Sequence, residues 1–325
     1  MNFDVEQIFK IKTNKDFQDQ CMKTFFFQME KNPIYANYAN RILKGKTPEN
    51  IEEIPFLPIE FFKTEQIICQ GRKIEEVFIS SGSTGFKSKH LISELEIYES
   101  SFRNTFQLFY GDVKDYCILS LLPNYRERDA SSLIYMVDEL IKSSKHEKSG
   151  FYLNNYKRLS ETISELEKNG QKTILFGVSY ALLDLANQFP QKLRNTIIME
   201  TGGTKGRRKE YLKDELHKLL KSAFELDIIH SEYGMTELLS QSYSKGDGIF
   251  YSPPWMKILI REVNDPLCIV GDNITGGINI IDLANIYSCP FIASSDLGRK
   301  NPDESFYILG RYDSSDIRGC NLLIQ

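Results

Sequence analysis

The residues best suited to chemistry begin with a serine- and glycine-rich loop that follows a short apolar run. The loop consists of Ser80, Ser81, Gly82, Ser83, Thr84 and Gly85, and Lys87 and Lys89 come after it. Glycines let the backbone approach an anion closely, main-chain N–H groups and hydroxyls donate hydrogen bonds, and lysines add positive charge. The loop therefore indicates a phosphate site or, equally well on its own, a flexible hairpin or linker. It is not a P-loop, because no Gly-Lys-Ser/Thr closes it at the required spacing.

A second group, Tyr233, Gly234, Thr236 and Glu237, follows a strand that the sequence predicts at Asp227–His230. Ligands of α/β sheets bind at the carboxyl ends of strands. A tyrosine ring can stack on a base, a threonine hydroxyl can bond a phosphate, and a carboxylate can hold Mg²⁺ together with phosphate oxygens. The alternative is that Thr236 caps a helix with Glu237 in its first turn, and caps are far commoner than sites.

A third group places acids beside arginines in what the sequence predicts to be β-turns. Asp296 precedes Arg299, and Arg311 precedes Asp313. An aspartate can accept both hydroxyls of a ribose, and an arginine can bridge sugar and phosphate. The alternative is a pair of β-turns with a surface ion pair.

The elements that would position these groups alternate between short apolar runs and amphipathic stretches, which predicts an α/β fold with a mostly parallel sheet. Strands are expected at Glu76–Ser80, Cys117–Leu122, Thr173–Phe176, Thr196–Met199 and Asp227–His230, and helices at Asp16–Lys31, Glu94–Tyr110, Ser131–Ser143, Lys157–Asn169, Tyr180–Gln188 and Lys209–Ala223. After residue 248 shorter strands with Gly and Pro turns predict a smaller β-rich layer beside the main sheet.

We expect one integrated domain with three parts. Residues 1–75 form a lead-in packed on the core, with an extended, proline-fixed segment at Ile54–Lys63. Residues 76–248 form the α/β nucleotide-binding core, and residues 249–325 form a β-rich segment that ends in a mobile tail.

Composition narrows the class of protein further. The 325 residues include 40 basic and 44 acidic ones, so the net charge is −4 and no basic stripe predicts nucleic-acid binding. No apolar run is long enough for a membrane span and no secretory signal is present at the N-terminus, which favours a cytoplasmic location. The six cysteines contain no Cys-x-x-Cys pair, so reduced thiols are expected.

Together, and in this order, the three groups resemble the motifs of the adenylate-forming superfamily, which includes acyl-CoA synthetases, adenylation domains and firefly luciferase. The resemblance implies ATP and Mg²⁺ as cofactors. It implies that Tyr233 stacks on adenine in a pocket lined by Gly202 and Gly203, that Thr236 meets the α-phosphate, and that Glu237 helps to hold Mg²⁺. Asp296 and Arg311 would hold the ribose. Many members have Pro-Lys where this loop ends Phe86-Lys87-Ser88-Lys89, so the phosphate lysine is either Lys87 or Lys89.

Typical members continue into a mobile C-terminal domain, whereas this chain stops twelve residues after Asp313. In that respect, and in segments such as Ile281–Asn285, it resembles the LuxE-type acyl-protein synthetases over nearly its whole length. That likeness implies that Cys320, after Arg318 and Gly319, accepts the acyl group as a thioester, and a neighbouring cation could lower its pKa.

The sequence thus predicts an enzyme that activates a carboxylic acid, in particular a fatty acid, as an acyl-adenylate and transfers the acyl group to Cys320 or onward to a partner protein. One alternative is a ligase similar to phenylacetate-CoA ligase, or a standalone adenylating protein, that hands the acyl group to CoA or a carrier. Another is a nucleotide-binding protein without catalytic activity.

Overall fold

The computed structural model describes residues 4–80, 87–123, 130–153, 155–202 and 213–311. Its helices are α1 Asn14–Lys31, α2 Pro33–Leu43, α3 Phe61–Thr64, α4 Leu95–Tyr110, α5 Ser132–Ser144, α6 Tyr156–Lys168, α7 Ser179–Gln188 and α8 Lys213–Phe224. Its strands are β1 Leu57–Pro58, β2 Glu76–Ile79, β3 Lys89–Ile92, β4 Cys117–Leu121, β5 Gly150–Phe151, β6 Thr173–Gly177, β7 Thr196–Glu200, β8 His230–Tyr233, β9 Ser242–Ser244, β10 Ile249–Tyr251, β11 Met256–Arg261, β12 Ile269–Val270, β13 Thr275–Asp282, β14 Phe291–Lys300 and β15 Phe306–Arg311.

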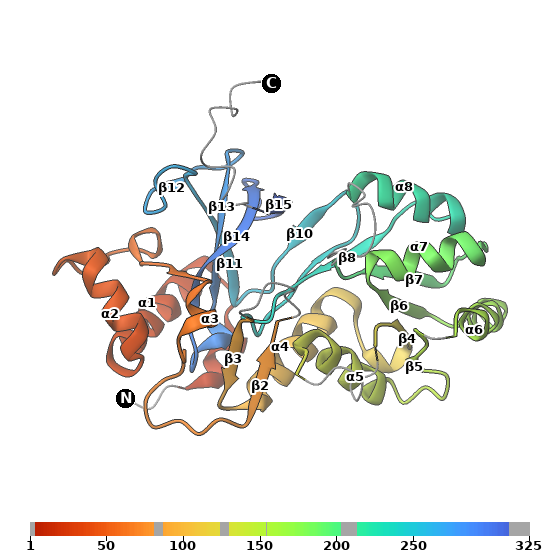
Figure 1. Ribbon diagram of the computed structural model, residues 1–325, viewed down its shortest axis with the longest axis horizontal. Helices are drawn as coiled ribbons and strands as arrows, with labels where there is room; N and C mark the ends of the chain where they lie inside the picture. Colours follow the sequence, from red (N-terminus) through yellow and green to blue (C-terminus); the bar gives the residue numbers. More distant parts are fainter. Residues whose placement is uncertain (1–3, 81–86, 124–129, 154, 203–212, 312–325) are drawn as a thin grey trace.

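The parallel part of the fold consists of β5, β4, β6, β7 and β8 in that spatial order (Figure 1). Strands β4 and β6 are buried along their whole length because helices cover both faces. Helices α6, α7 and α8 pack on one face through residues such as Leu159, Leu182 and Leu220, and α4 and α5 pack on the other. This confirms the α/β class.

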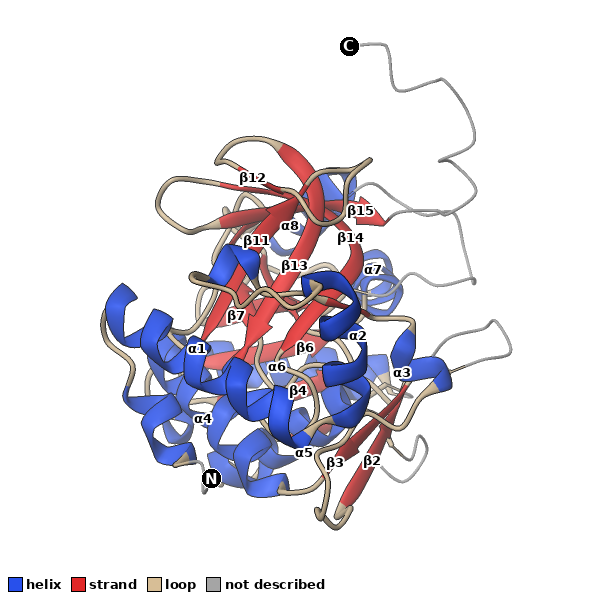
Figure 2. Ribbon diagram, turned by 90° about the vertical axis from the view of Figure 1, so that its left-hand side faces the viewer, coloured by secondary structure: helices blue, strands red, loops and turns tan. Residues whose placement is uncertain are grey.

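The sequence predicted that the β-rich C-terminal part forms a separate layer beside the main sheet, and this prediction is wrong. The strands from β9 to β15 instead extend the same sheet, which has thirteen strands in the part of the chain that the structure describes. The antiparallel strands β13 and β14 are long, and they run up the middle of this part of the sheet (Figure 2). One continuous sheet therefore joins the second and third candidate groups.

The lead-in packs against this antiparallel part. Helix α1 begins with a capping box between Thr13 and Asp16, and α2 begins with Pro33 at its first turn. Between the two helices, buried Asn32 donates its side-chain amide to the Ser288 carbonyl at 2.7 Å. The segment expected to be extended at Ile54–Lys63 is so only in part, because Phe61–Thr64 forms a helical turn.

Two strands differ from the sequence prediction in ways that matter for the site. Residues Glu76–Ile79 do not join the parallel sheet but pair with Lys89–Ile92 as a separate antiparallel hairpin. Strand β8 begins at His230 and includes Tyr233, whereas the predicted strand ended at His230. The sequence of His230–Tyr233 lacks an alternation of apolar and polar residues. The strand was therefore predicted around the apolar residues Ile228 and Ile229, which precede it.

Candidate active site

Three of the predicted site residues meet at the end of β8. The Tyr233 hydroxyl donates to Oδ2 of Asp296 at 2.8 Å, and Nε of Arg311 lies 3.2 Å from Oδ1 of the same carboxylate. Asp296 and Arg311 face each other across β14 and β15, so they lie in strands and not in the β-turns that the sequence predicted. The two side chains of this ion pair differ in exposure: that of Asp296 is 9% exposed and that of Arg311 is 61% exposed.

The ring of Tyr233 is fixed by its neighbours. Phe250 and Phe306 each lie with their ring centroids 6.0 Å from it. Burial, and then the charge of Asp296, raises the pKa of Tyr233 well above its ordinary value. The phenol therefore stays protonated and donates its hydrogen to the carboxylate at every physiological pH.

Thr236 and Glu237 lie in a turn, not at the start of a helix. The backbone N–H of Leu238 donates to the Met235 carbonyl at 3.1 Å, which closes the turn. Neither residue belongs to a helix, so the alternative of an ordinary helix cap is wrong. Contacts from outside the turn must therefore hold its backbone in place.

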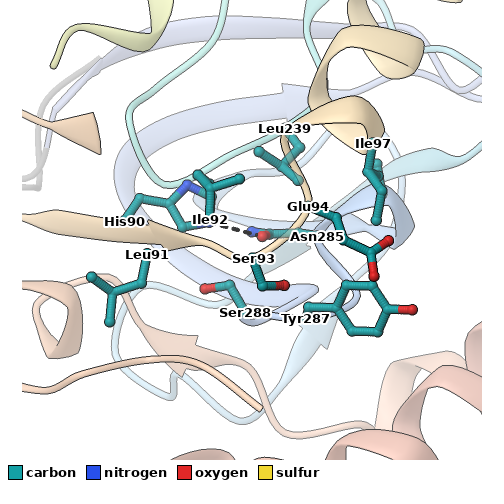
Figure 3. A pocket seen from close by; sticks show the side chains of 11 residues that line it. His90, Leu91, Ile92, Ser93, Glu94, Ile97, Leu239, Asn285, Tyr287 and Ser288 are labelled. Carbon is teal, nitrogen blue, oxygen red and sulfur yellow. Dashed lines mark hydrogen bonds between the residues drawn. The ribbon is translucent and has the colours of Figure 1, made fainter. Parts of the chain in front are cut away.

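These contacts come from His90 and Asn285, which the sequence did not identify as site residues. Nδ1 of His90 lies 2.8 Å from the Thr236 carbonyl, and its Nε2 lies 2.9 Å from Oδ1 of Asn285 (Figure 3). Asn285 in turn donates its amide to the carbonyls of Glu237 and Cys289, at 2.8 and 3.0 Å. Because His90 follows Lys89 directly in β3, this network ties the strand after the serine loop to the Thr236–Glu237 turn.

The protonation of His90 follows from its surroundings. Both ring nitrogens face oxygen acceptors, and the orientation of the Asn285 amide is fixed by the two carbonyls that it serves. Complete burial nevertheless lowers the pKa of His90 to about 4, against the effect of these hydrogen bonds. The ring is neutral at pH 7, so it carries one N–H and donates to only one of its two partners.

A small pocket borders this network. Besides His90 and Asn285 it is lined by Ser93 and Tyr287, whose side chains are drawn in Figure 3. Its volume of about 10 Å³ leaves room for no more than one water molecule. It is therefore too small to be a nucleotide or acyl site.

A buried carboxylate holds the residues that follow the turn. Asp282, at the end of β13, accepts from the backbone N–H groups of Leu239 and Ser240 at 2.8 and 3.0 Å, and from the Ser240 hydroxyl at 2.6 Å. Its side chain is fully buried, and burial raises its pKa while these hydrogen bonds oppose the change. The segment Ile281–Asn285, noted in the sequence only for its likeness, thus supplies two supports of the site.

The two ends of the serine loop are described, although Ser81, Gly82, Ser83, Thr84 and Gly85 lie outside the described residues. Ser80 and Ser88 close the loop, because the Ser88 N–H donates to the Ser80 hydroxyl and the Ser80 N–H donates to the Ser88 carbonyl, both at 3.0 Å. Lys87 and Lys89 are exposed, and the alternate residues Ser88 and His90 are buried. Both lysines therefore point outward from the base of the loop.

The two predicted glycines that the structure describes each have a reason to be glycine. Gly202 has a φ of +63°, a conformation that other residues rarely adopt. Gly234 leaves room for the Glu232 carboxylate, since a Cβ there would lie 2.5 Å from Oε1 of Glu232. Gly203 lies outside the described residues, as does Cys320.

Four of the five described cysteines are poor nucleophiles. Cys21, Cys69, Cys117 and Cys289 are buried, and burial raises the pKa of each thiol. Cys268 is exposed, on the turn between β11 and β12. No group of three or more His, Cys, Asp or Glu side chains in the described part of the chain is arranged to hold a metal ion.

The chain matches one protein family over nearly its whole length. The model of the acyl-protein synthetase family LuxE matches residues 12–325. The chain is also 21% identical over 342 residues to a long-chain-fatty-acid–luciferin-component ligase of Vibrio harveyi, covering 97% of this chain and 89% of that protein.

Solved structures agree on the fold. A 2-hydroxyisobutyryl-CoA ligase in complex with 2-HIB-AMP and CoA has a TM-score of 0.67 at 12% identity, covering 93% of this chain and 68% of that one. ATP-bound MatB from Rhodopseudomonas palustris has a TM-score of 0.54 at 15% identity over 72% of this chain. The chain spans about half of MatB, 47% of its length. Within the described residues, no helix is both long and apolar enough to cross a membrane.

Proposed function

The chain belongs to the LuxE family of acyl-protein synthetases, and we propose that it activates a fatty acid as an acyl-adenylate and transfers the acyl group to its own Cys320. The contact of Tyr233 and Arg311 with the single buried carboxylate of Asp296 is the observation that carries this proposal. A carboxylate held in this way, with one oxygen beside an exposed arginine, is suited to accept the two hydroxyls of a ribose.

The remaining roles are those that the resemblance implies, and we carry them over as part of the proposal. The Thr236 hydroxyl meets the α-phosphate, Gly202 lines the adenine pocket, and Lys87 or Lys89 approaches the outer phosphates from the base of the serine loop. In adenylation, an oxygen of the fatty-acid carboxylate forms a bond to the α-phosphorus of ATP. The bond from that phosphorus to the bridging oxygen breaks, and pyrophosphate leaves with the electron pair.

Glu237 is the residue that would hold Mg²⁺. It is one carboxylate, and Mg²⁺ in nucleotide sites is commonly bound by one or two carboxylates together with substrate phosphates and water. When bound, the ion would neutralise phosphate charge, while the His90–Asn285 network keeps the Glu237 backbone in place.

In the second step the Cys320 thiolate attacks the acyl carbonyl. A carbon–sulfur bond forms, the bond from the acyl carbon to the phosphate oxygen breaks, and AMP leaves; the thiol proton passes to solvent. The buried thiols of Cys21, Cys69, Cys117 and Cys289 are unsuited to this step, because burial disfavours the thiolate. Cys268 is exposed and therefore provides the matched control.

Two measurements test the proposal. Fatty-acid-dependent exchange of labelled pyrophosphate into ATP should occur with acids of some chain length, and a complete lack of exchange across a broad panel of acids would refute adenylation. Labelled acid with ATP should leave a hydroxylamine-labile label that Cys320→Ser abolishes and Cys268→Ser retains. Label that persists in Cys320→Ser would place the acceptor elsewhere, and release of acyl-CoA when CoA is added would favour a CoA ligase.

A further inference from the structure

Glu200, the last residue of β7, is a buried carboxylate that no motif in the sequence marked. It is 4% exposed, and its Oε1 atom accepts two hydrogen bonds of 2.8 Å. One comes from the hydroxyl of Ser179 at the start of α7, and the other comes from the backbone N–H of Gly202. The carboxylate thus reaches forward two residues and fixes the turn that follows its own strand.

The Gly202 turn is held from two sides. The N–H of the preceding residue, Thr201, donates to the Gly177 carbonyl at 3.1 Å, which anchors the turn to β6. A Cβ built on Gly202 would meet no described atom within 4 Å. Gly202 has no side chain to separate its backbone from a ligand, which suits close approach of a flat ring.

Lys213 connects this turn to Tyr233. Its ammonium group lies 4.0 Å from Oε2 of Glu200 and 4.3 Å from the centroid of the Phe250 ring. Phe250 in turn lies 6.0 Å from the ring of Tyr233. Burial lowers the pKa of Lys213, while Glu200 opposes that change and so helps to keep the charge on the lysine. The buried carboxylate of Glu200 thus faces the charge of a partly exposed lysine.

We propose that Glu200 and Lys213 are positioning residues for adenine, one holding the Gly202 turn and the other the ring of Tyr233. The proposal rests on the adenine pocket of the proposed function. Glu200 orders the Gly202 side through its hydrogen bond, and Lys213 orders the Tyr233 side through Phe250. Neither side chain touches the base.

Equilibrium titration with ATP, in the absence of any acid, tests the idea without requiring turnover. Glu200→Ala should raise the Kd for ATP about tenfold, because the Gly202 N–H loses a charged acceptor. Glu200→Gln should stay within about threefold of the native Kd, since its amide oxygen can still accept from Gly202. Ser179→Ala is the matched control: it removes the other hydrogen bond to the same oxygen and should change the Kd by less than about twofold.

Binding of a second ligand distinguishes contacts with the base from contacts with the phosphates. Tripolyphosphate shares the phosphate chain of ATP but has no ring to stack, so Glu200→Ala and Lys213→Met should bind it as the native protein does, while both bind ATP more weakly. Equal loss for ATP and tripolyphosphate would overturn the proposal, and so would an equal loss of ATP affinity in Ser179→Ala and Glu200→Ala. If Glu200→Ala does not fold, Lys213→Met carries the test, because it leaves the hydrogen bonds to Gly202 intact. Pyrophosphate exchange is measured separately. If no exchange is found, the proposed adenylation is refuted, and the ATP titration still tests the roles of Glu200 and Lys213.

Discussion

Replacing Asn285 by alanine should weaken both the fold and the reaction, for one structural reason. Its side chain is fully buried, donates to the carbonyls of Glu237 and Cys289, and faces Nε2 of His90. Each of these contacts contributes about 1 kcal/mol, so Asn285→Ala should lower the free energy of unfolding by about 3 kcal/mol. For a chain of this size that loss corresponds to a decrease in Tm of about 5 °C.

The effect on the reaction should exceed the effect of instability alone. Without Asn285 the Glu237 backbone loses its anchor, so pyrophosphate exchange per folded molecule should fall about tenfold or more and require more Mg²⁺ for half-saturation. Asn32→Ala is the control, because Asn32 is also fully buried and makes three hydrogen bonds, with Tyr35, Gln28 and Ser288. It should lose similar stability and keep the native Mg²⁺ requirement. Equal exchange defects in the two variants would refute the reasoning, and so would an unchanged Tm in Asn285→Ala.

Two further predictions concern the supports of the site. A Cβ at Gly298 would lie 2.6 Å from the Tyr307 carbonyl, so Gly298→Ala should lose about 2–3 kcal/mol of stability in urea unfolding, whereas Gly271→Ala, which meets no described atom, should change it by less than about 0.5 kcal/mol. His90 has a folded pKa of about 4 against an ordinary value of 6.5, so the unfolded chain binds its proton first and stability falls as pH drops from about 6.5 towards 4. His90→Gln should therefore reduce the loss of unfolding free energy between pH 7 and 5 by about 2 kcal/mol, and an unchanged loss would show that His90 is not neutral in the folded state.

Much of the fold could be predicted because its helices carry an amphipathic period and the strands β4 and β6 are short apolar runs. Helix α4, for example, was expected at Glu94–Tyr110 and is found at Leu95–Tyr110. The path of the sheet could not be predicted, since strand order depends on contacts between residues far apart in sequence. The continuation of one sheet from β8 through β15 is such a property, and local pattern carries no signal for it.

In the candidate site, too, some residues could be predicted from the sequence and others could not. Tyr233, Asp296 and Arg311 could be identified by residue type and order, and the structure brings them together. His90 and Asn285 could not, because a buried histidine between an exposed lysine and an apolar strand is indistinguishable from a core residue until its partners are known. Their pairing joins positions 195 residues apart. The one signal in the sequence was the alternation of Lys87 and Lys89 with Ser88 and His90, which in a strand places His90 on the face opposite the two lysines.

The register of the last described strand has a consequence for the kinetics of acyl transfer. Arg311 is both a partner of Asp296 and the residue at which β15 ends, and Cys320 follows it by nine residues. Covalent geometry alone keeps Cys320 within roughly 30 Å of Arg311, whatever path the chain takes between them. Short tethers of this kind give effective concentrations on the order of millimolar. A thiol on such a tether would react with the activated acid faster than an equally reactive free thiol at micromolar concentration. The covalent link to the chain, rather than binding affinity, would therefore determine the first acyl acceptor.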